Sequence, residues 1–125
     1  MWAEPIIARV AATRAIRLWA PVAVWAALIF ALSSIPSLST GLGLWDTILR
    51  KCAHTLEYAI LGALLLRTRL AWPAVLTLGI AYAASDEVHQ SFVRGRHASP
   101  VDVGIDMIGL AIGILVACRA SSWAR

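Results

Sequence analysis

Four apolar runs dominate this chain and restrict what it can fold into. They cover residues 18–32, 52–66, 72–84 and 101–118. Hydrophobic residues make up 60% of the sequence and charged residues only 14%, whereas a soluble domain carries about 25% charged residues. The mean hydropathy of +0.76 leaves too little polar surface to coat a water-soluble globule. We therefore predict an all-α integral membrane bundle of four transmembrane helices.

The lengths of the runs predict one membrane domain, 15–119, with a short tail on each side. A transmembrane helix needs about 20 residues, so each run must extend into polar sequence at one end. The predicted spans are about 16–34, 48–66, 71–90 and 101–118, and the predicted cytoplasmic tails are 1–14 and 120–125. The first tail is either mobile or an interfacial helix. Pro21 is expected in the first turn of its span, where proline is tolerated.

The distribution of basic residues favours cytoplasmic N- and C-termini. With four spans, the residues inside would be Arg9, Arg14, Arg17, Arg67, Arg69, Arg119 and Arg125, and those outside would be Arg50, Lys51, Arg94 and Arg96. Such an excess of Lys and Arg marks the cytoplasmic flanks of membrane spans. A competing interpretation is a secretory signal ending near residues 31–33, whose cleavage would leave three spans.

This orientation brings the polar ends of three predicted helices to the outer side of the membrane. Those ends hold Lys51, His54 and Glu57 in the second helix, residues 86–90 in the third, and Asp102 and Asp106 in the fourth. An ionised group within a bilayer is costly unless it is paired or hydrated. The sequence therefore predicts an outward-facing polar pocket where the three ends meet. His97 lies in the following loop, and we expect it to be exposed.

The two aspartates of the last run share a helical face with two glycines. Asp102, Asp106, Gly109 and Gly113 are spaced by four, three and four residues, which places them on one stripe of a helix. Small residues in a GxxxG pattern let transmembrane helices approach closely. The stripe therefore predicts that both acids face the bundle interior and not the lipid.

The cluster of charges admits other interpretations. It could be a structural ion-pair network that fixes the helices in register. His54 and Glu57 could also ligate a metal together with Asp86 or Asp106, by analogy with Glu-x-x-His sites in helical bundles, but the order of the pair is reversed, and we expect no metal and no cofactor. The GxSxG, GxxxxGK[ST] and HExxH motifs are absent from the sequence.

The sequence disfavours both nucleic-acid binding and a disulfide bond. The net charge of +4 is spread along the chain and forms no basic patch, so we expect no nucleic-acid binding. Cys52 and Cys118 fall near opposite membrane faces in the predicted topology. Their separation argues against a disulfide.

Three blocks of sequence resemble those of the VanZ-like family. Residues 51–62, KCAHTLEYAILG, resemble its K-x-x-H-x-x-E-Y-x-x-L-G block. Residues 85–96, SDEVHQSFVRGR, resemble S-D-E-x-x-Q-x-F-x-x-x-R, with Arg94 where the family often has proline. Residues 102–113, DVGIDMIGLAIG, resemble D-x-x-x-D-x-x-G-x-x-x-G.

The resemblance implies a small multi-pass protein of the bacterial cytoplasmic membrane. The namesake of the family is linked to low-level resistance to the glycopeptide teicoplanin, so the resemblance implies a process but no reaction.

Our leading hypothesis is a pocket that binds or modifies a cell-envelope component, such as a lipid headgroup, a cell-wall precursor or a glycopeptide. The expected ligand-binding residues are Lys51, Tyr58, Glu87, Gln90, Arg94, Arg96, Asp102 and Asp106, and the expected helix-packing residues are Gly62, Gly109 and Gly113. The expected partners are membrane lipids and this ligand, and self-association is left open.

The alternative hypothesis is a membrane-embedded hydrolase or transferase acting on a lipid-linked phosphate or sugar. His54 would be the general base, and Glu57 or Asp86 would orient it. The sequence leaves open whether any reaction is catalysed. A proton- or ion-coupled carrier is disfavoured, because the polar residues occupy only one half of the predicted bilayer.

Overall fold

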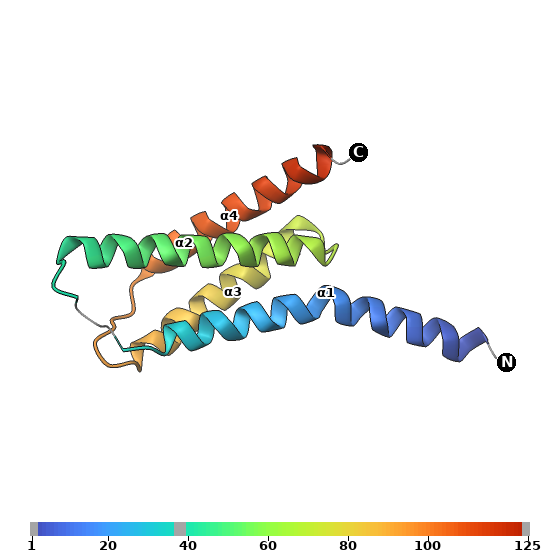
Figure 1. Cartoon of the computed structure of the whole chain (residues 1–125), viewed down its shortest axis with the longest axis horizontal. Coiled ribbons are helices and arrows are strands. Elements are labelled where there is room, and N and C mark those ends of the chain that lie inside the picture. The colour runs from blue at the N-terminus through green and yellow to red at the C-terminus, as the bar shows by residue number, and fades with distance from the viewer. Residues whose placement is uncertain (1–2, 37–39, 124–125) are drawn as a thin grey trace.

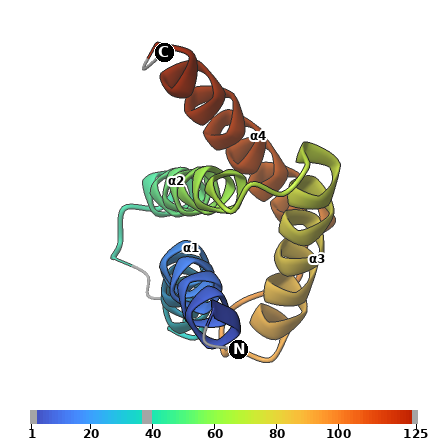
Figure 2. The same ribbon diagram turned by 90° about the vertical axis from the view of Figure 1, so that its right-hand side faces the viewer.

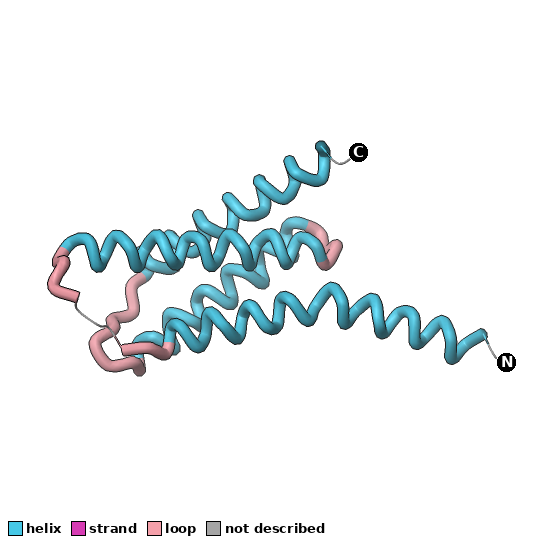
Figure 3. Tube along the Cα trace, in the orientation of Figure 1, coloured by secondary structure: helices cyan, strands magenta, loops and turns pink. Residues whose placement is uncertain are grey.

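The computed structural model describes residues 3–36 and 40–123 and folds them into four α-helices. In chain order these are α1 (Ala3–Ser33), α2 (Leu44–Arg67), α3 (Trp72–Ser91) and α4 (Pro100–Trp123). The described segments contain no β-strand, as the tube view of Figure 3 makes plain. The prediction of an all-α fold with four helices is therefore confirmed.

The four helices bring their polar ends to the same end of the bundle. Figure 1 shows the C-terminal ends of α1 and α3 and the N-terminal end of α4 at the same end of the bundle. The N-terminal end of α2 lies on the same side, and both chain termini lie at the opposite end. The end-on view of Figure 2 shows α1, α2 and α3 arranged around a common centre, with α4 leaning away past α2. The convergence of polar helix ends that was inferred from hydropathy is thus present in the fold.

The contact between α2 and α4 is the most extensive in the bundle. Gly109 lies against the backbone of Thr55, Gly113 against the backbone of Ala59, and Gly62 against the backbone of Leu110. A Cβ atom at any of these three glycines would overlap the facing helix. The two helices run in the same direction, and glycine lets their backbones touch.

The buried core is small, and many large apolar side chains face outward. Its buried apolar members are Val22 and Ile29 of α1, Tyr58, Leu61 and Leu65 of α2, Val75 and Ala83 of α3, and Leu110 of α4. Exposed apolar side chains occur on every helix, including Val24, Leu56, Val88 and Leu115. A soluble monomer rarely exposes apolar patches this extensive. The outer surface therefore suits contact with lipid.

Two of the four helices are long and apolar enough to cross a membrane on their own. They are the segments Pro5–Ser33, with a mean hydropathy of 1.9, and Pro100–Ser122, with a mean hydropathy of 2.1. The other two described helices, α2 and α3, do not reach this level. α2 carries five charged residues, Asp46, Arg50, Lys51, Glu57 and Arg67, and α3 carries Asp86 and Glu87. Two spans are thus supported by length and composition, and the four-span topology stays a prediction.

The N-terminal part of the chain is helical. Residues 3–14, expected to be a mobile tail or an interfacial helix, form the first turns of α1, and residues 1–2 lie outside the described residues. Pro21 lies inside α1 and not in its first turn, so that prediction was wrong. Proline removes one backbone hydrogen bond and crowds the preceding turn, and Figure 1 shows α1 bent along its length. At the other end α4 extends to Trp123, and residues 124–125 are not described.

The tight contact between α2 and α4 makes a test of the fold. Gly113→Ala should destabilise the protein by about 1–3 kcal/mol, because the new methyl group overpacks a backbone contact. Gly104→Ala is the matched control on the same helix, since its added Cβ would meet no atom within 4 Å apart from its chain neighbours and the backbone of its own helix. Alanine also favours helix by about 1 kcal/mol over glycine, so this control should hold or raise stability. Thermal unfolding in detergent measures both, and equal midpoints would contradict the proposed packing.

Candidate functional site

A cavity of about 200 Å³ opens at the polar end of the bundle. Residues from α2, the end of α3, the α3–α4 loop and the start of α4 line it: Thr47, Arg50, Lys51, His54, Gln90, Gly95, Arg96, His97, Asp102, Ile105 and Asp106. Asp106 and Gln90 are buried, whereas Thr47, Gly95 and His97 are exposed. The cavity therefore has a buried floor with Asp106 and Gln90 beside the half-buried His54, and a more open mouth lined by the half-buried Arg50, Lys51 and Arg96.

The structure brings six of the predicted site residues to this cavity and leaves others outside it. Those that line it are Lys51, His54, Gln90, Arg96, Asp102 and Asp106. Those that do not are Glu57, Tyr58, Asp86, Glu87 and Arg94. Tyr58, Asp86 and Glu87 are buried, and Arg94 is exposed in the loop. Their predicted roles in binding or catalysis stay predictions.

Two side-chain pairs join α2 to α4 at successive depths. Near the mouth, Nζ of Lys51 donates to Oδ1 of Asp102 at 2.5 Å, and both side chains are more than one-third exposed. Such an exposed ion pair contributes little stability. Deeper in the bundle, Nδ1 of His54 lies 3.2 Å from Oδ1 of Asp106, whose side chain is 1% exposed. The two atoms are within ion-pair distance but lack the alignment of a hydrogen bond.

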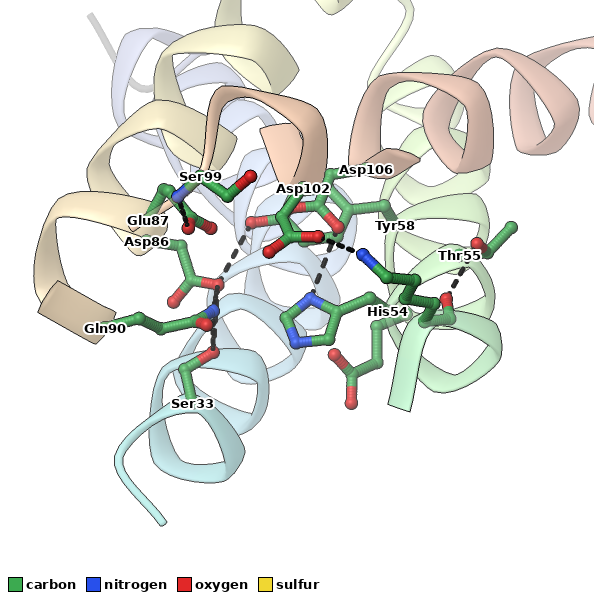
Figure 4. Close-up of polar contacts among 12 residues, drawn as sticks. Ser33, His54, Thr55, Tyr58, Asp86, Glu87, Gln90, Ser99, Asp102 and Asp106 are labelled. Carbon is green, nitrogen blue, oxygen red and sulfur yellow. Dashed lines mark hydrogen bonds and ion pairs between the residues drawn. The ribbon is translucent and has the colours of Figure 1, made fainter. Parts of the chain in front are cut away.

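Asp86 is held by donors from three helices, as Figure 4 shows. Its Oδ2 atom accepts hydrogen bonds from Oγ of Ser33 at 2.9 Å and from Nε2 of Gln90 at 3.0 Å. The hydroxyl of Tyr58 donates to the same oxygen at 3.4 Å. All four side chains are buried. One oxygen of Asp86 is thus fixed by neutral donors, which stabilise a buried carboxylate without cancelling its charge.

Several buried oxygens at this end of the bundle receive no hydrogen bond. Among the described residues, no aligned donor reaches Oδ1 of Asp86, Oε2 of Glu87 or either carboxylate oxygen of Asp106. Native proteins pair the large majority of buried polar atoms. Of these three acids Asp106 lines the cavity, and its unpaired oxygens mark a place where a ligand or ion can satisfy them.

Glu87 and Arg96 tie the ends of helices together. Oε1 of Glu87 accepts a hydrogen bond from the backbone N–H of Ser99, at the start of α4, where a negative charge is favourable. Arg96 donates from Nε to the carbonyl of Ile35 at 3.0 Å and from Nη1 to Oε1 of Gln90 at 3.1 Å. Burial, together with the like charge of Arg50, lowers the pKa of Arg96 from its ordinary value, but arginine remains protonated at neutral pH.

One arginine that lines the cavity, Arg50, was not among the predicted site residues. No ion pair or side-chain hydrogen bond within the described part of the chain engages Arg50, which lines the mouth of the cavity. His97 was expected to be exposed, and it is, yet it also lines the cavity. Ser33 was missed as well, although it is buried and contacts Asp86. Its place directly after the first apolar run was the only signal for it.

His89 serves a contact with α1 and does not line the cavity. Its ring stacks on Phe30 with centroids 4.1 Å apart, and its Nε2 atom lies 2.9 Å from Oγ of Ser34. Its exposure is intermediate. This histidine fixes α3 against the end of α1, so of the three histidines only His54 and His97 face the cavity.

Comparison with known proteins gives one finding. A family model described as VanZ/LLP1 matches residues 10–121, which is nearly the whole chain. No curated protein and no solved structure matches the chain. The matched range includes every residue of the cavity and the three glycines of the α2–α4 contact.

Proposed function

The chain belongs to the VanZ-like family, and from that premise we propose that it is a membrane protein whose polar pocket binds an anionic headgroup of a cell-envelope component. The single observation that carries the proposal is the cavity at the polar end, with basic residues at its mouth. Together with the family match, the two span-capable helices mark the chain as a membrane protein.

The charge of the mouth supports an anionic ligand. Arg50, Lys51 and Arg96 line the cavity. Lys51 is already paired with Asp102, and Arg96 is hydrogen-bonded to Ile35 and Gln90. Arg50 has no such partner within the described segments, so its guanidinium can engage a phosphate or carboxylate with two parallel hydrogen bonds. We assign the main ligand contact to Arg50.

The direction of α2 and α4 also favours an anionic ligand. The N-terminal ends of both α2 and α4 lie at the polar end of the bundle (Figure 1). The N-terminus of a helix carries a partial positive charge and free N–H groups, which favour anions. Thr47 of α2 and Asp102 of α4 both line the cavity, so the cavity lies close to both helix starts.

The size of the cavity narrows the choice of ligand. At about 200 Å³ it is smaller than the roughly 300–1,000 Å³ of pockets that take drug-sized molecules. A phosphate-bearing headgroup is compatible with this volume, and a whole glycopeptide is not. If the chain influences glycopeptide action, it does so through a lipid or cell-wall precursor and not by sequestering the drug in this cavity.

We further propose a four-span topology in the bacterial inner membrane, with the cavity facing outward. At the end opposite the cavity, Arg9, Arg14, Arg17 and Arg67 line one surface groove. Such a cluster suits the cytoplasmic face under the positive-inside rule. In α2 and α3 the polar residues concentrate at the cavity end, so their remaining surfaces can face lipid.

A second candidate function is catalysis by His54, and one observation favours it. The imidazole lies at the cavity floor beside the buried Asp106, a placement that can orient a histidine as a general base. The sequence had suggested Glu57 or Asp86 for this orienting role. Among the described contacts the partner is Asp106, so an enzyme of this design would use His54 and Asp106.

Topology can be tested by thiol labelling. In a chain with Cys52 and Cys118 replaced by Ala, a cysteine at position 98 should react with a membrane-impermeant maleimide on intact cells, because the α3–α4 loop would lie outside. A cysteine at position 69, in the α2–α3 loop, should react only after the cells are opened. Labelling of position 69 but not 98 would reverse the proposed orientation, and labelling of both from outside would exclude four spans.

Headgroup binding can be tested with short-chain lipids. Purified protein should bind dihexanoyl phosphatidic acid more tightly than dihexanoyl phosphatidylcholine, and Arg50→Ala should weaken the former about tenfold, since a charge-assisted hydrogen bond contributes about 1.5–3 kcal/mol. Arg94, which the sequence had suggested as a ligand contact, is exposed and lies outside the cavity. Arg94→Ala is therefore the matched control and should bind like wild type. A parallel titration with inorganic phosphate separates recognition of the lipid from recognition of phosphate alone. Equal affinities for all variants would refute the role of Arg50.

The link to glycopeptides can be tested in a susceptible host. Wild type and Arg50→Ala would be expressed at matched membrane levels, and the binding of labelled teicoplanin to the cell surface would be measured together with susceptibility. We expect wild type to lower both and the variant to lower neither. If wild type leaves both unchanged, the resistance role of the family namesake does not extend to this chain.

A further inference from the structure

Three ligand-type side chains from three helices converge behind the floor of the cavity. His54 of α2, Asp86 of α3 and Asp106 of α4 each place one potential metal-ligating atom within 4.8 Å of the other two. Figure 4 shows the three side chains gathered between these helices. Asp86 is 2% exposed and Asp106 is 1% exposed. Two carboxylates are thus buried side by side, with one imidazole as their neighbour.

Each of the three side chains keeps at least one potential ligand atom without a hydrogen bond from the described residues. Oδ2 of Asp86 accepts from Ser33, Gln90 and Tyr58, while Oδ1 of the same carboxylate receives no donor from the described residues. Both oxygens of Asp106 and Nδ1 of His54 also lack an aligned hydrogen-bond partner there. Neutral donors therefore fix the orientation of Asp86 and leave one of its oxygens available, as the surrounding hydrogen bonds do for ligands in metal sites.

The distribution of charge around the two buried acids also favours a bound cation. Lys51 is paired with Asp102 nearer the mouth, and Arg96 is hydrogen-bonded to Gln90 and to the end of α1. Neither basic residue forms an ion pair with Asp86 or Asp106 in the described structure. His54 is the one basic side chain at ion-pair distance from either acid in the described structure, so two buried carboxylates share at most one positive charge, which is expensive. A divalent cation supplies both the missing charge and the missing bonds.

We propose that His54, Asp86 and Asp106 bind a divalent transition-metal ion such as Mn²⁺ or Zn²⁺. One imidazole with two carboxylates suits these ions better than Mg²⁺ or Ca²⁺, which prefer all-oxygen surroundings. Bonds of about 2.0–2.2 Å place two Zn²⁺ ligands at most about 4.4 Å apart, so the side chains need only a small inward rotation. Glu57, which sequence analysis had weighed as a ligand beside His54, does not belong to this cluster.

The location of the site gives the ion a route to a ligand. His54 and Asp106 both line the cavity, so coordination positions not filled by the three side chains open toward it. Three protein ligands with open positions are typical of metal sites that engage water or substrate. This inference goes beyond the proposed headgroup binding and does not depend on it, because the ion is held by different residues.

The test uses the full chain in detergent and the metal alone. Protein freed of metal with EDTA would be titrated with Mn²⁺, and free Mn²⁺ would be followed by electron paramagnetic resonance, with Zn²⁺ added as competitor. Wild type should bind one Mn²⁺ that Zn²⁺ displaces. Asp106→Asn and Asp86→Asn should weaken binding by at least about tenfold, a loss comparable to those caused by changes around known metal sites.

Asp102→Asn is the matched control for charge. It makes the same chemical change one helical turn from Asp106, in a residue that lines the cavity but lies outside the cluster. The Mn²⁺ affinity of this variant should fall by less than about threefold, the small effect expected of a screened neighbouring charge. A loss equal to that of Asp106→Asn would show diffuse attraction to acidic residues and overturn the site. Absence of saturable Mn²⁺ binding by wild type would also overturn it.

Folding is controlled within the same experiment. Each variant would be checked by gel filtration and thermal unfolding, and His54→Gln serves if an aspartate variant fails to fold. Bound metal should also raise the unfolding midpoint of wild type, because a ligand that binds only the folded state stabilises it. The midpoint of His54→Gln should not respond to metal, and a response equal to wild type would contradict the assignment of this histidine.

Discussion

The close approach of α4 to α2 is the constraint on which the rest of the structure depends. Gly109 and Gly113 lie directly on the backbone of Thr55 and Ala59, which fixes the rotation and the register of α4. With that register, one turn nearer the polar end Asp106 meets His54, and one turn further Asp102 meets Lys51. Any larger residue at these glycines would separate the helices and lengthen both polar contacts. The GxxxG pattern therefore acts on the site through geometry, although no glycine of this contact touches the cavity.

The acids so placed need support from the other two helices. Carboxylates in an apolar bundle lose the solvation of water, and the loss must be offset by hydrogen bonds or opposite charge. The end of α1 provides Ser33, and α3 provides Asp86 together with Gln90. Arg96 closes the arrangement by binding the end of α1 and Gln90 at once. The polar end is thus held mainly by hydrogen bonds among all four helices, whereas the opposite end lets α4 diverge (Figure 1).

The parts predictable from sequence were those governed by periodicity. The 3.6-residue repeat placed Asp102, Asp106, Gly109 and Gly113 on one face, and all four do face α2 or the cavity. Periodicity says nothing of rotation between helices, so it could not choose among Glu57, Asp86 and Asp106 as the neighbour of His54. Ser33 was missed for the same reason, since its partner Asp86 lies on another helix. Arg50 was counted among the outer basic residues, but periodicity could not show that it lines the cavity. Hydropathy also misplaced the start of the first helix, because α1 begins at Ala3 and its first turns expose Arg9 and Arg14 beside Ile6, Ile7 and Val10.

The mouth and the floor of the cavity carry opposite charge, and this arrangement constrains what can occupy it. Arg50 at the mouth attracts an anion, whereas Asp106 at the floor repels one that enters deeply. A phosphate alone would therefore stop near the mouth. A cation between His54, Asp86 and Asp106 would reverse the sign of the floor and let a phosphate oxygen approach it. Because coupling between two ligands is reciprocal, such an anion would in turn strengthen the binding of the cation. The polar end of the bundle would then be one site with two linked ligands. The cation would neutralise the buried acids, and the anion would neutralise the basic mouth.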